Sequence, residues 1–155
     1  LKYRGWRALA EPMAEAMAAI HLPVAPDEPP LLVVPVPTTR RRVRERGYNQ
    51  AELLARAFAA RTGRTVLPAL ERISASASQT TLQPAARRAN VAGSFRVAGD
   101  LKAALRGRHL LLVDDVLTTG ATTLECGATL IAAGARAVSV LTFARALDVR
   151  RLLET

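Results

Sequence analysis

Short apolar runs and helix-like patterns alternate along the chain. The runs at 31–36 and 110–113 are almost continuous and only a few residues long, which is typical of strands buried on both faces of a parallel sheet. Between them, apolar residues recur three and four positions apart, as on one face of a helix. We predict strands at 31–36, 65–73, 95–97, 110–113 and 137–143, and helices at 6–20, 50–62, 101–106, 124–133 and 147–153. This alternation predicts an α/β fold with a mostly parallel central sheet flanked by helices.

Two segments interrupt the pattern. Residues 22–30 are proline-rich and form a connector, so that 1–30 comprise an N-terminal helix and linker. Residues 74–90 are rich in Ser and Ala, and such a long stretch inside a compact domain is usually a lid or a disordered segment. Pro68 marks the predicted strand at 65–73 as an edge strand or a bulged one. At 155 residues the chain has the length of a single domain.

The stretch 110–123 holds the most specific candidate chemistry. Asp114 and Asp115 follow the apolar run at once, and a turn of small residues, 118–122, precedes the next helix. Ligands of open α/β sheets bind outside the carboxyl ends of the strands, and a turn that opens a helix directs backbone N–H groups at an anion such as phosphate. The two acids would repel a phosphate but suit hydroxyl groups or a hydrated metal ion. The alternative is an ordinary strand, turn and helix in which Asp114 caps the helix.

A second strand end also leads into polar residues. The segment 39–49 is predicted to be a loop, and it contains Arg40, Arg41, Arg42, Arg44 and Arg46. Guanidinium groups bind phosphate oxygens in a bidentate manner, so this cluster favours an anion-binding role. For any single arginine, a solvated surface position is an equally good interpretation.

Charge and composition narrow the class of protein. The formal net charge is +9, carried almost wholly by arginine, which favours phosphorylated ligands or nucleic acid. A genome rich in G and C would also enrich Arg and Ala, which is an alternative explanation of the positive charge. Cys126 is the single cysteine, which excludes an internal disulfide and a cysteine-rich zinc site in this sequence. No apolar run approaches the roughly 20 residues that span a bilayer and no signal peptide is visible, so we expect a cytoplasmic protein without membrane contact.

The pattern of an apolar run, two acids and Thr-Thr-Gly-x-Thr resembles the phosphoribosyl-pyrophosphate (PRPP) motif of type I phosphoribosyltransferases. The resemblance implies that Asp114 and Asp115 hold the ribose hydroxyls, with Mg²⁺ carried in by PRPP near them rather than bound by a dedicated metal site. It implies a 5′-phosphate loop of Thr118, Thr119, Gly120, Ala121 and Thr122. It further implies a pyrophosphate loop with Val36, Pro37, Thr38, Arg40 and Arg41, and a flexible loop with Gln79, Thr80, Arg87, Arg88 and Asn90.

Several further segments resemble one branch, the ComF family, which is linked to DNA uptake in natural transformation. They are LKYRGWRALAEPMAE at the start, PVPTTRRRVRERGYNQAELLAR, the spacing from Gln79 and Thr80 to Asn90, and LTFARA at the end of the last predicted strand. Full-length members of that family begin with a cysteine-rich zinc-binding segment, so we expect further residues before Leu1. The purine-salvage members of the superfamily carry an aspartate that serves the nucleobase where this chain has Thr118, so the acceptor and the catalytic residues remain unassigned.

Two functions of different classes follow from these resemblances. The first is a PRPP-dependent phosphoribosyltransferase that uses Mg²⁺. The second is a non-catalytic competence factor that contacts single-stranded DNA or a helicase, for which the arginines supply the charge. Aromatic residues make up only 4% of the chain, which weighs against autonomous binding of single strands, because such proteins stack bases on aromatic rings. A regulator that senses PRPP without catalysis is a third possibility. The oligomeric state is left open.

Overall fold

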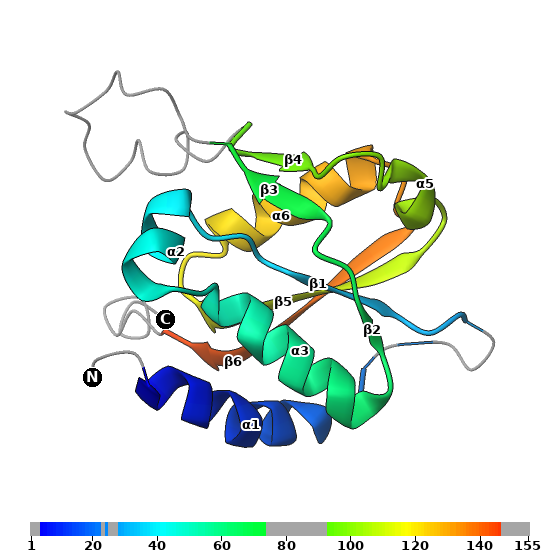
Figure 1. The fold of residues 1–155 in the computed structure, drawn as a ribbon. Helices are drawn as coiled ribbons and strands as arrows, with labels where there is room; N and C mark the ends of the chain where they lie inside the picture. Colours follow the sequence, from blue (N-terminus) through cyan, green and yellow to red (C-terminus); the bar gives the residue numbers. More distant parts are fainter. Residues whose placement is uncertain (1–3, 23, 25–27, 74–92, 147–155) are drawn as a thin grey trace, which may run out of the picture.

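The computed structural model describes residues 4–22, 24, 28–73 and 93–146. Its helices are α1 (Arg4–Ala18), α2 (Arg40–Arg46), α3 (Gln50–Thr62), α5 (Lys102–Leu105) and α6 (Ala121–Ala132). Its strands are β1 (Leu32–Pro35), β2 (Thr65–Val66), β3 (Leu70–Arg72), β4 (Phe95–Val97), β5 (His109–Leu117) and β6 (Ala137–Arg145). Figure 1 shows the strands of the central sheet between two layers of helices.

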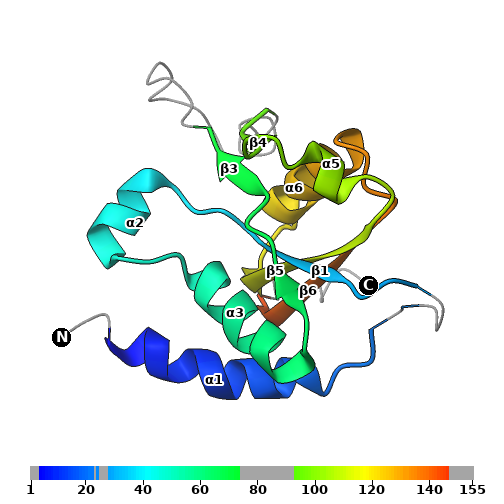
Figure 2. The ribbon, with the colours of Figure 1, turned by 45° about the vertical axis from the view of Figure 1, so that its right-hand side comes forward.

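Within the described residues, the central sheet has four parallel strands in the order β2-β1-β5-β6. Helices α1 and α3 cover one face, and α5 and α6 lie on the other together with the β3–β4 hairpin (Figures 1 and 2). Alternate residues of the inner strands serve the two faces: Leu111 packs with α1 and α3, whereas Leu110 and Leu112 pack with α6. The predicted α/β fold with a parallel sheet flanked by helices is therefore confirmed.

The apolar run of β5 explains why this strand is central. Leu110, Leu111, Leu112 and Val113 are all fully buried, and β1 pairs with them in parallel register. Burial of each such side chain contributes roughly 1.5–3 kcal/mol relative to exposure. A strand that is apolar on both faces is stable only with a layer of helices on each side, which is the arrangement found.

The prediction of one strand at 65–73 is wrong. Pro68 separates two short strands that belong to different sheets: β2 pairs with β1 in the central sheet, and β3 pairs antiparallel with β4. Proline cannot donate a ladder hydrogen bond, so the chain leaves the central sheet here. Leu67 N still donates to Val33 O, whereas Ala69 O already accepts from Ala98 N beside the hairpin.

The prediction of a loop at 39–49 is also wrong, because residues Arg40–Arg46 form α2. Thr39 caps the helix by accepting a hydrogen bond from Arg42 N at 3.2 Å. Gly47 ends it with a left-handed φ of 81°, and its N–H donates to Val43 O. None of the residues of α2 is buried, so the apolar periodicity that reveals most helices is missing.

Strand β5 continues to Leu117, so Asp114 and Asp115 lie within the strand and not after it. Gly120, with a φ of 78°, occupies the N-cap position of α6. The alternative in which Asp114 caps this helix is therefore wrong. The predicted helix at 147–153 lies outside the described residues. No helix in the described part of the chain has the length and apolar character needed to cross a membrane.

Candidate functional site

The carboxyl ends of β1 and β5 lie side by side and carry the polar residues predicted from the sequence. Pro35 pairs with Val113, and Val36 N donates to Val113 O at 2.9 Å, so β1 ends directly beside Asp114 and Asp115, whereas β5 continues to Leu117 along β6. Asn49, the residue before α3, donates its side-chain amide to Val36 O at 2.9 Å. This bond fixes the end of β1 to the start of α3.

A cavity of about 190 Å³ lies at this edge of the sheet. It is lined by Val36, Pro37, Thr38, Arg42, Asn49, Gln50, Ala51, Arg72, Asp114, Asp115, Val116 and Thr122. Six of these residues are among those predicted from the sequence, drawn from three separate segments: Val36, Pro37, Thr38, Asp114, Asp115 and Thr122. The structure thus brings the predicted ribose acids, one residue of the predicted phosphate loop and the start of the predicted pyrophosphate loop into one hollow.

The two acids differ in their surroundings. Asp114 is partly buried and lines the cavity, and its Oδ1 accepts a hydrogen bond from Asp115 N at 3.0 Å. Burial is the main cause that raises the pKa of Asp114 to about 7; the Asp115 N–H opposes this shift, and the neighbouring Asp115 carboxylate adds to it. Asp115 Oδ1 accepts from Val116 N at 2.8 Å. In the described part of the chain neither acid has an ion-pair partner, so both are available to a ligand.

The predicted phosphate loop turns at Gly120, whose positive φ leads directly into α6. Thr123 donates its hydroxyl to Gly120 O at 2.9 Å, and Thr119 Oγ1 accepts from Ala121 N at 3.4 Å. The first N–H groups of a 12-residue helix have no partners within the helix and carry the positive end of its dipole. Thr122 lines the cavity, whereas Thr118 and Thr119 are exposed beside it.

The arginines of α2 point in different directions around the helix. Arg42 lines the 190 Å³ cavity, and Arg40 lines a second cavity of about 430 Å³ next to it. Arg41 points to solvent with an 83% exposed side chain and pairs with Glu45 at 2.6 Å. Arg46 bonds to Gln50. Of the two predicted pyrophosphate-loop arginines, Arg40 therefore faces a cavity and Arg41 does not line either one.

Sequence reasoning missed Arg72, which lines both cavities. It lies on β3 opposite Phe95 of β4, with its guanidinium carbon 5.4 Å from the centre of that ring. This position depends on a pairing between strands more than twenty residues apart, and no local signal marks it. The predicted flexible-loop residues Gln79, Thr80, Arg87, Arg88 and Asn90 lie outside the described residues.

The donor set at this edge suits Mg²⁺ that arrives with phosphate groups. Among the described residues, no group of three or more His, Cys, Asp or Glu side chains could hold a metal ion. Asp114 and Asp115 offer hard carboxylate oxygens from one side only. Mg²⁺ is commonly bound by one or two carboxylates together with substrate phosphates, so the residues present fit that mode of binding.

Comparison with known proteins finds several relatives of the chain. The chain is 36% identical to the DNA utilization protein YhgH of Escherichia coli K12 over 116 residues, which are 74% of the chain and 49% of that protein. It is 34% identical to YhgH of Salmonella typhi over 142 residues, covering 91% and 59% of the two chains. Competence protein F of Haemophilus influenzae is 34% identical over 118 residues, covering 76% and 51%.

The chain is a homologue of these DNA utilization and competence proteins, in agreement with the predicted resemblance to the ComF family. It spans about half the length of most of the curated relatives it matches. No family model matches the chain.

Two solved structures share the fold. The glutamine PRPP amidotransferase of B. subtilis, in complex with ADP and GMP, superposes with a TM-score of 0.56 at 17% identity over 88% of this chain and 26% of the enzyme. A structure described as the allosteric regulatory enzyme of purine biosynthesis gives a TM-score of 0.54 at 19% identity, covering 89% and 25%. The fold is that of the type I phosphoribosyltransferases.

Proposed function

We propose that this domain binds PRPP, or a closely related phosphoribosyl compound, together with Mg²⁺, and that it is a phosphoribosyltransferase. The observation that carries the proposal is the single 190 Å³ cavity that joins Asp114, Asp115 and Thr122 to Thr38, Arg42 and Arg72. These groups complement the three parts of PRPP. The acids match the ribose diol, the helix N-terminus matches the 5′-phosphate, and the arginines match the pyrophosphate.

Each part of the ligand has a matching part of the chain. The first N–H groups of α6 and the Thr122 hydroxyl bind the 5′-phosphate. Asp114 and Asp115 accept hydrogen bonds from the ribose hydroxyls. The pyrophosphate lies between Thr38, Arg42 and Arg72, which approach from β1, α2 and β3. Arg72 is held for this role by its contact with the Phe95 ring.

Transfer from PRPP passes through an oxocarbenium-like state as pyrophosphate leaves, and the work of the protein is mainly positioning and charge stabilisation. Arg42 and Arg72 stabilise the charge that develops on the leaving group. The carboxylates hold the ribose ring and favour the positive charge that develops on it. Mg²⁺ supplies further neutralisation of the pyrophosphate. Thr118 cannot act as a general base. The acceptor, a basic nucleobase or another nucleophile, must therefore react without losing a proton to this residue.

The relatives' names connect this chemistry to DNA. Curated homologues are named for DNA utilization and for competence, and we place the domain in the same process as part of the proposal. A domain that binds PRPP would there couple the handling of incoming DNA to the nucleotide supply.

The decisive experiment measures pyrophosphate release from PRPP and Mg²⁺ with a panel of nucleobases, nucleosides and amines as acceptors. Release that depends on one acceptor, and that disappears in the Asp114→Asn/Asp115→Asn variant, supports transfer. Binding of PRPP without release for any acceptor would instead identify a PRPP sensor. Absence of both binding and release would refute the proposal.

Single-stranded DNA binding is the second candidate, favoured by the outer face of α2. Arg41 and Arg44 are exposed there and line neither cavity. If they bind a DNA backbone, replacing both with Gln should lower the salt dependence of binding by about 0.7 in log–log slope for each phosphate that is no longer neutralised. Failure of the parent protein to bind single strands at low salt would dispose of this candidate for the domain.

A further inference from the structure

One edge of the central sheet is long and apolar. Strand β6 forms this edge, and among the described residues its only strand partner is β5. The strand at the opposite edge, β2, is two residues long and offers little backbone for pairing with another chain. β6 is nine residues long and contains no lysine, proline or acidic residue. The sequence features that commonly protect a sheet edge from other chains are therefore missing from β6.

Strand β6 exposes large apolar side chains on both of its faces. Val140 and Phe143 are each 46% exposed. Alternate residues of a strand share a face, so Val140 lies on the face of Val138, which packs with the core beneath α6. Phe143 lies on the face of Leu141, which packs with the core beneath α1 and α3. The exposed apolar surface therefore continues on both sides of the sheet.

The helix on one face extends this surface. Leu124 is 74% exposed, and the exposed Ala128 and Ile131 follow it four and seven positions later, so the three residues form one stripe along α6. Gly127 lies next to this stripe and faces β6, because a Cβ added there would meet Val138 Cγ1 at 4.0 Å. The stripe thus runs along the flank of α6 on the β6 side.

The helix on the other face has a similar flank. Leu9 of α1 is half-exposed, and the exposed Pro12 and Ala16 follow it three and seven positions later. On the other side of α1, Glu11 pairs with Arg61 of α3 at 3.4 Å. Because α3 lies over β1 and β5 and α1 packs beside it over β6, the flank with Leu9 borders the β6 edge (Figures 1 and 2).

The apolar edge is therefore three layers thick, and this thickness determines which partner covers it. A single added peptide strand would pair with the β6 backbone but would leave Leu124 and Leu9 in water, because both lie in the helix layers. A partner whose own sheet lies between two layers of helices covers all three layers at once. The present chain has that architecture.

We propose that two copies of this chain pair their β6 edges antiparallel, about a two-fold axis perpendicular to the sheet, and form a dimer with one continuous sheet. Such an axis keeps each helix layer on its own side, so α6 lies beside α6 and α1 beside α1. The α6 stripe suits this symmetry. Leu124 of one copy meets Ile131 of the other, and the small Ala128 between them lets the two helices approach closely.

Charge permits this pairing although each copy has a net charge of +9. Arg145 is the only charged residue of β6, and the α6 stripe has none. With the axis at Leu141, Arg145 of one copy lies opposite the uncharged Ala137 of the other. The adjacent Arg136 is already paired with Glu28 at 2.6 Å, which limits repulsion between the copies.

The size of the edge also fits a dimer. An interface of standard size uses roughly 20–30 residues of each partner. The nine-residue β6, with one flank each of the 15-residue α1 and the 12-residue α6, supplies a surface of that order. The edge does not line the 190 Å³ cavity, so the dimer does not depend on the proposed phosphoribosyl site.

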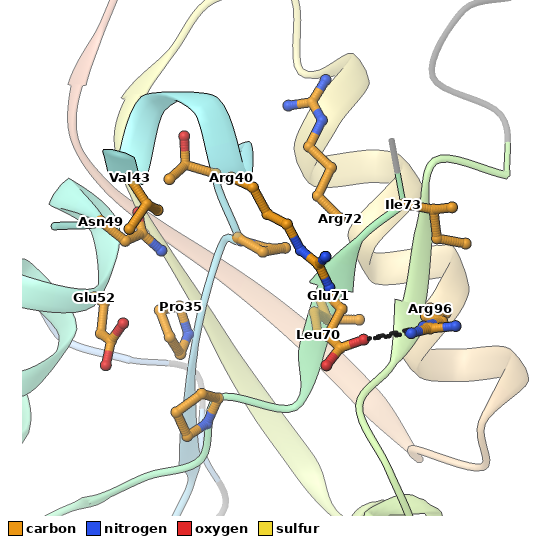
Figure 3. Close-up of a pocket in the computed structure, with 13 residues that line it drawn as sticks. Pro35, Arg40, Val43, Asn49, Glu52, Leu70, Glu71, Arg72, Ile73 and Arg96 are labelled. Atoms are coloured by element: carbon orange, nitrogen blue, oxygen red, sulfur yellow. Dashed lines mark hydrogen bonds and ion pairs between the residues drawn. The ribbon is translucent and has the colours of Figure 1, made fainter. Parts of the chain in front are cut away.

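The first test measures self-association of the 155-residue chain by sedimentation equilibrium over a concentration series from micromolar to near millimolar. Wild type should reach the mass of a dimer. Leu124→Glu and Ile131→Glu should each raise the dimer dissociation constant at least tenfold, because each places a charge in the apolar contact between the α6 helices. The matched control is Val43→Glu, the same change at a half-exposed aliphatic residue of α2 on the 430 Å³ cavity (Figure 3), which should leave the constant unaltered. Circular dichroism checks that each variant is folded.

The second test locates the two-fold axis by cross-linking. The native Cys126 is buried, so a cysteine introduced on the surface of α6 is the thiol that an oxidant reaches. Ala128→Cys, near the axis, should form a disulfide-linked dimer under mild oxidation. Ala132→Cys, exposed one turn further along the same helix and away from the axis, should not.

A protein that stays monomeric throughout the concentration series would overturn the inference. A dimer that withstands both glutamate substitutions, or that cross-links as readily through Ala132→Cys as through Ala128→Cys, would place the interface elsewhere and overturn it as well. None of these results bears on PRPP binding, so the proposed function stands or falls separately.

Discussion

The two ends of β5 place ionisable residues in opposite circumstances. At the amino end, His109 contacts Glu28 at 3.0 Å and Ser139 at 2.9 Å, and Arg136 pairs with the same glutamate at 2.6 Å. Towards the carboxyl end, the adjacent residues Asp114 and Asp115 line a cavity and have no ion-pair partner in the described part of the chain. One end of β5 thus contacts a compensated acid, Glu28 of the linker before β1, and the other end carries two uncompensated acids.

The pKa values follow this difference. Hydrogen bonds from Arg136 and His109 lower the pKa of Glu28, whereas burial and the neighbouring carboxylate raise the pKa of Asp114 to about 7. The Glu28 cluster stabilises the fold by joining the linker before β1 to β5 and β6. Uncompensated acids destabilise the protein without its ligand. Such groups are typical of functional sites, where a bound ligand offsets the loss of stability. The comparison therefore supports a stabilising role for the amino end and the proposed ligand-binding role for the carboxyl end.

The largest expected effect is the loss of PRPP binding when the uncompensated acids are removed. Asp114→Asn/Asp115→Asn should weaken binding by roughly 100-fold or more, because hydrogen bonds to charged groups contribute about 1.5–3 kcal/mol each. Calorimetric titration with Mg²⁺ and PRPP measures the change. The matched control is Glu28→Gln at the other end of β5, which should leave the affinity unaltered. Equal PRPP affinities in wild type and in both variants would contradict a ligand-binding role for the carboxyl end of β5.

Two glycines on either side of β5 allow a second test. Gly120 and Gly107 both have a positive φ, 78° and 69°, and an added Cβ would meet no atom closer than 3.8 Å at either position. Alanine at each should cost about 1–2 kcal/mol of backbone strain in the unliganded protein. Only Gly120→Ala should also turn the N–H groups that open α6 away from the phosphate.

The measurement is the thermal shift produced by Mg²⁺ and PRPP. A ligand at about 100 times its dissociation constant stabilises the native state by about 2.7 kcal/mol, a shift of roughly 5–10 °C for a domain of this size. We expect wild type and Gly107→Ala to show this shift and Gly120→Ala to show little of it. A full shift in a folded Gly120→Ala protein would place the phosphate elsewhere.

The third prediction concerns stability and pH. The pKa of Asp114 is raised in the folded state from an ordinary value of 3.8 to about 7, so the folded protein keeps a proton that the unfolded chain has lost. Stability from this group is full below pH 3.8 and falls as pH rises to about 7. Asp114→Asn should therefore melt several degrees higher than wild type at pH 8, with an upper bound of about 4 kcal/mol, and should lose this difference near pH 4. A lower melting temperature at pH 8 would show that the carboxylate is compensated after all.

Much of this site follows from local sequence, and its limits have a physical cause. The acids, the phosphate turn and the end of β1 are contiguous motifs, and the parallel pairing of β1 with β5 brings them together. Helix α2 was missed because its exposed residues lack an apolar stripe, although Thr39 and Gly47 mark its ends. Arg72 was missed because its position depends on the pairing of β3 with β4, two strands that are more than twenty residues apart in the sequence. Its position also depends on the break at Pro68, which separates β3 from the central sheet.

The smallest expected effect is at the compensated end. The pKa of Glu28 is lowered below its ordinary 4.5 by Arg136 and His109, so its contribution to stability is present above pH 4.5 and is lost as pH falls through the lowered value. Glu28→Gln should therefore melt below wild type at pH 7 and approach it in acid, which is the opposite of the pH trend predicted for Asp114→Asn. Because Glu28 also holds His109, Ser139→Ala serves as a control that removes only the other contact of the imidazole. Parallel pH trends for Glu28→Gln and Asp114→Asn would mean that the two ends of β5 do not differ in charge compensation, and the division between a stabilising end and a binding end would have to be abandoned.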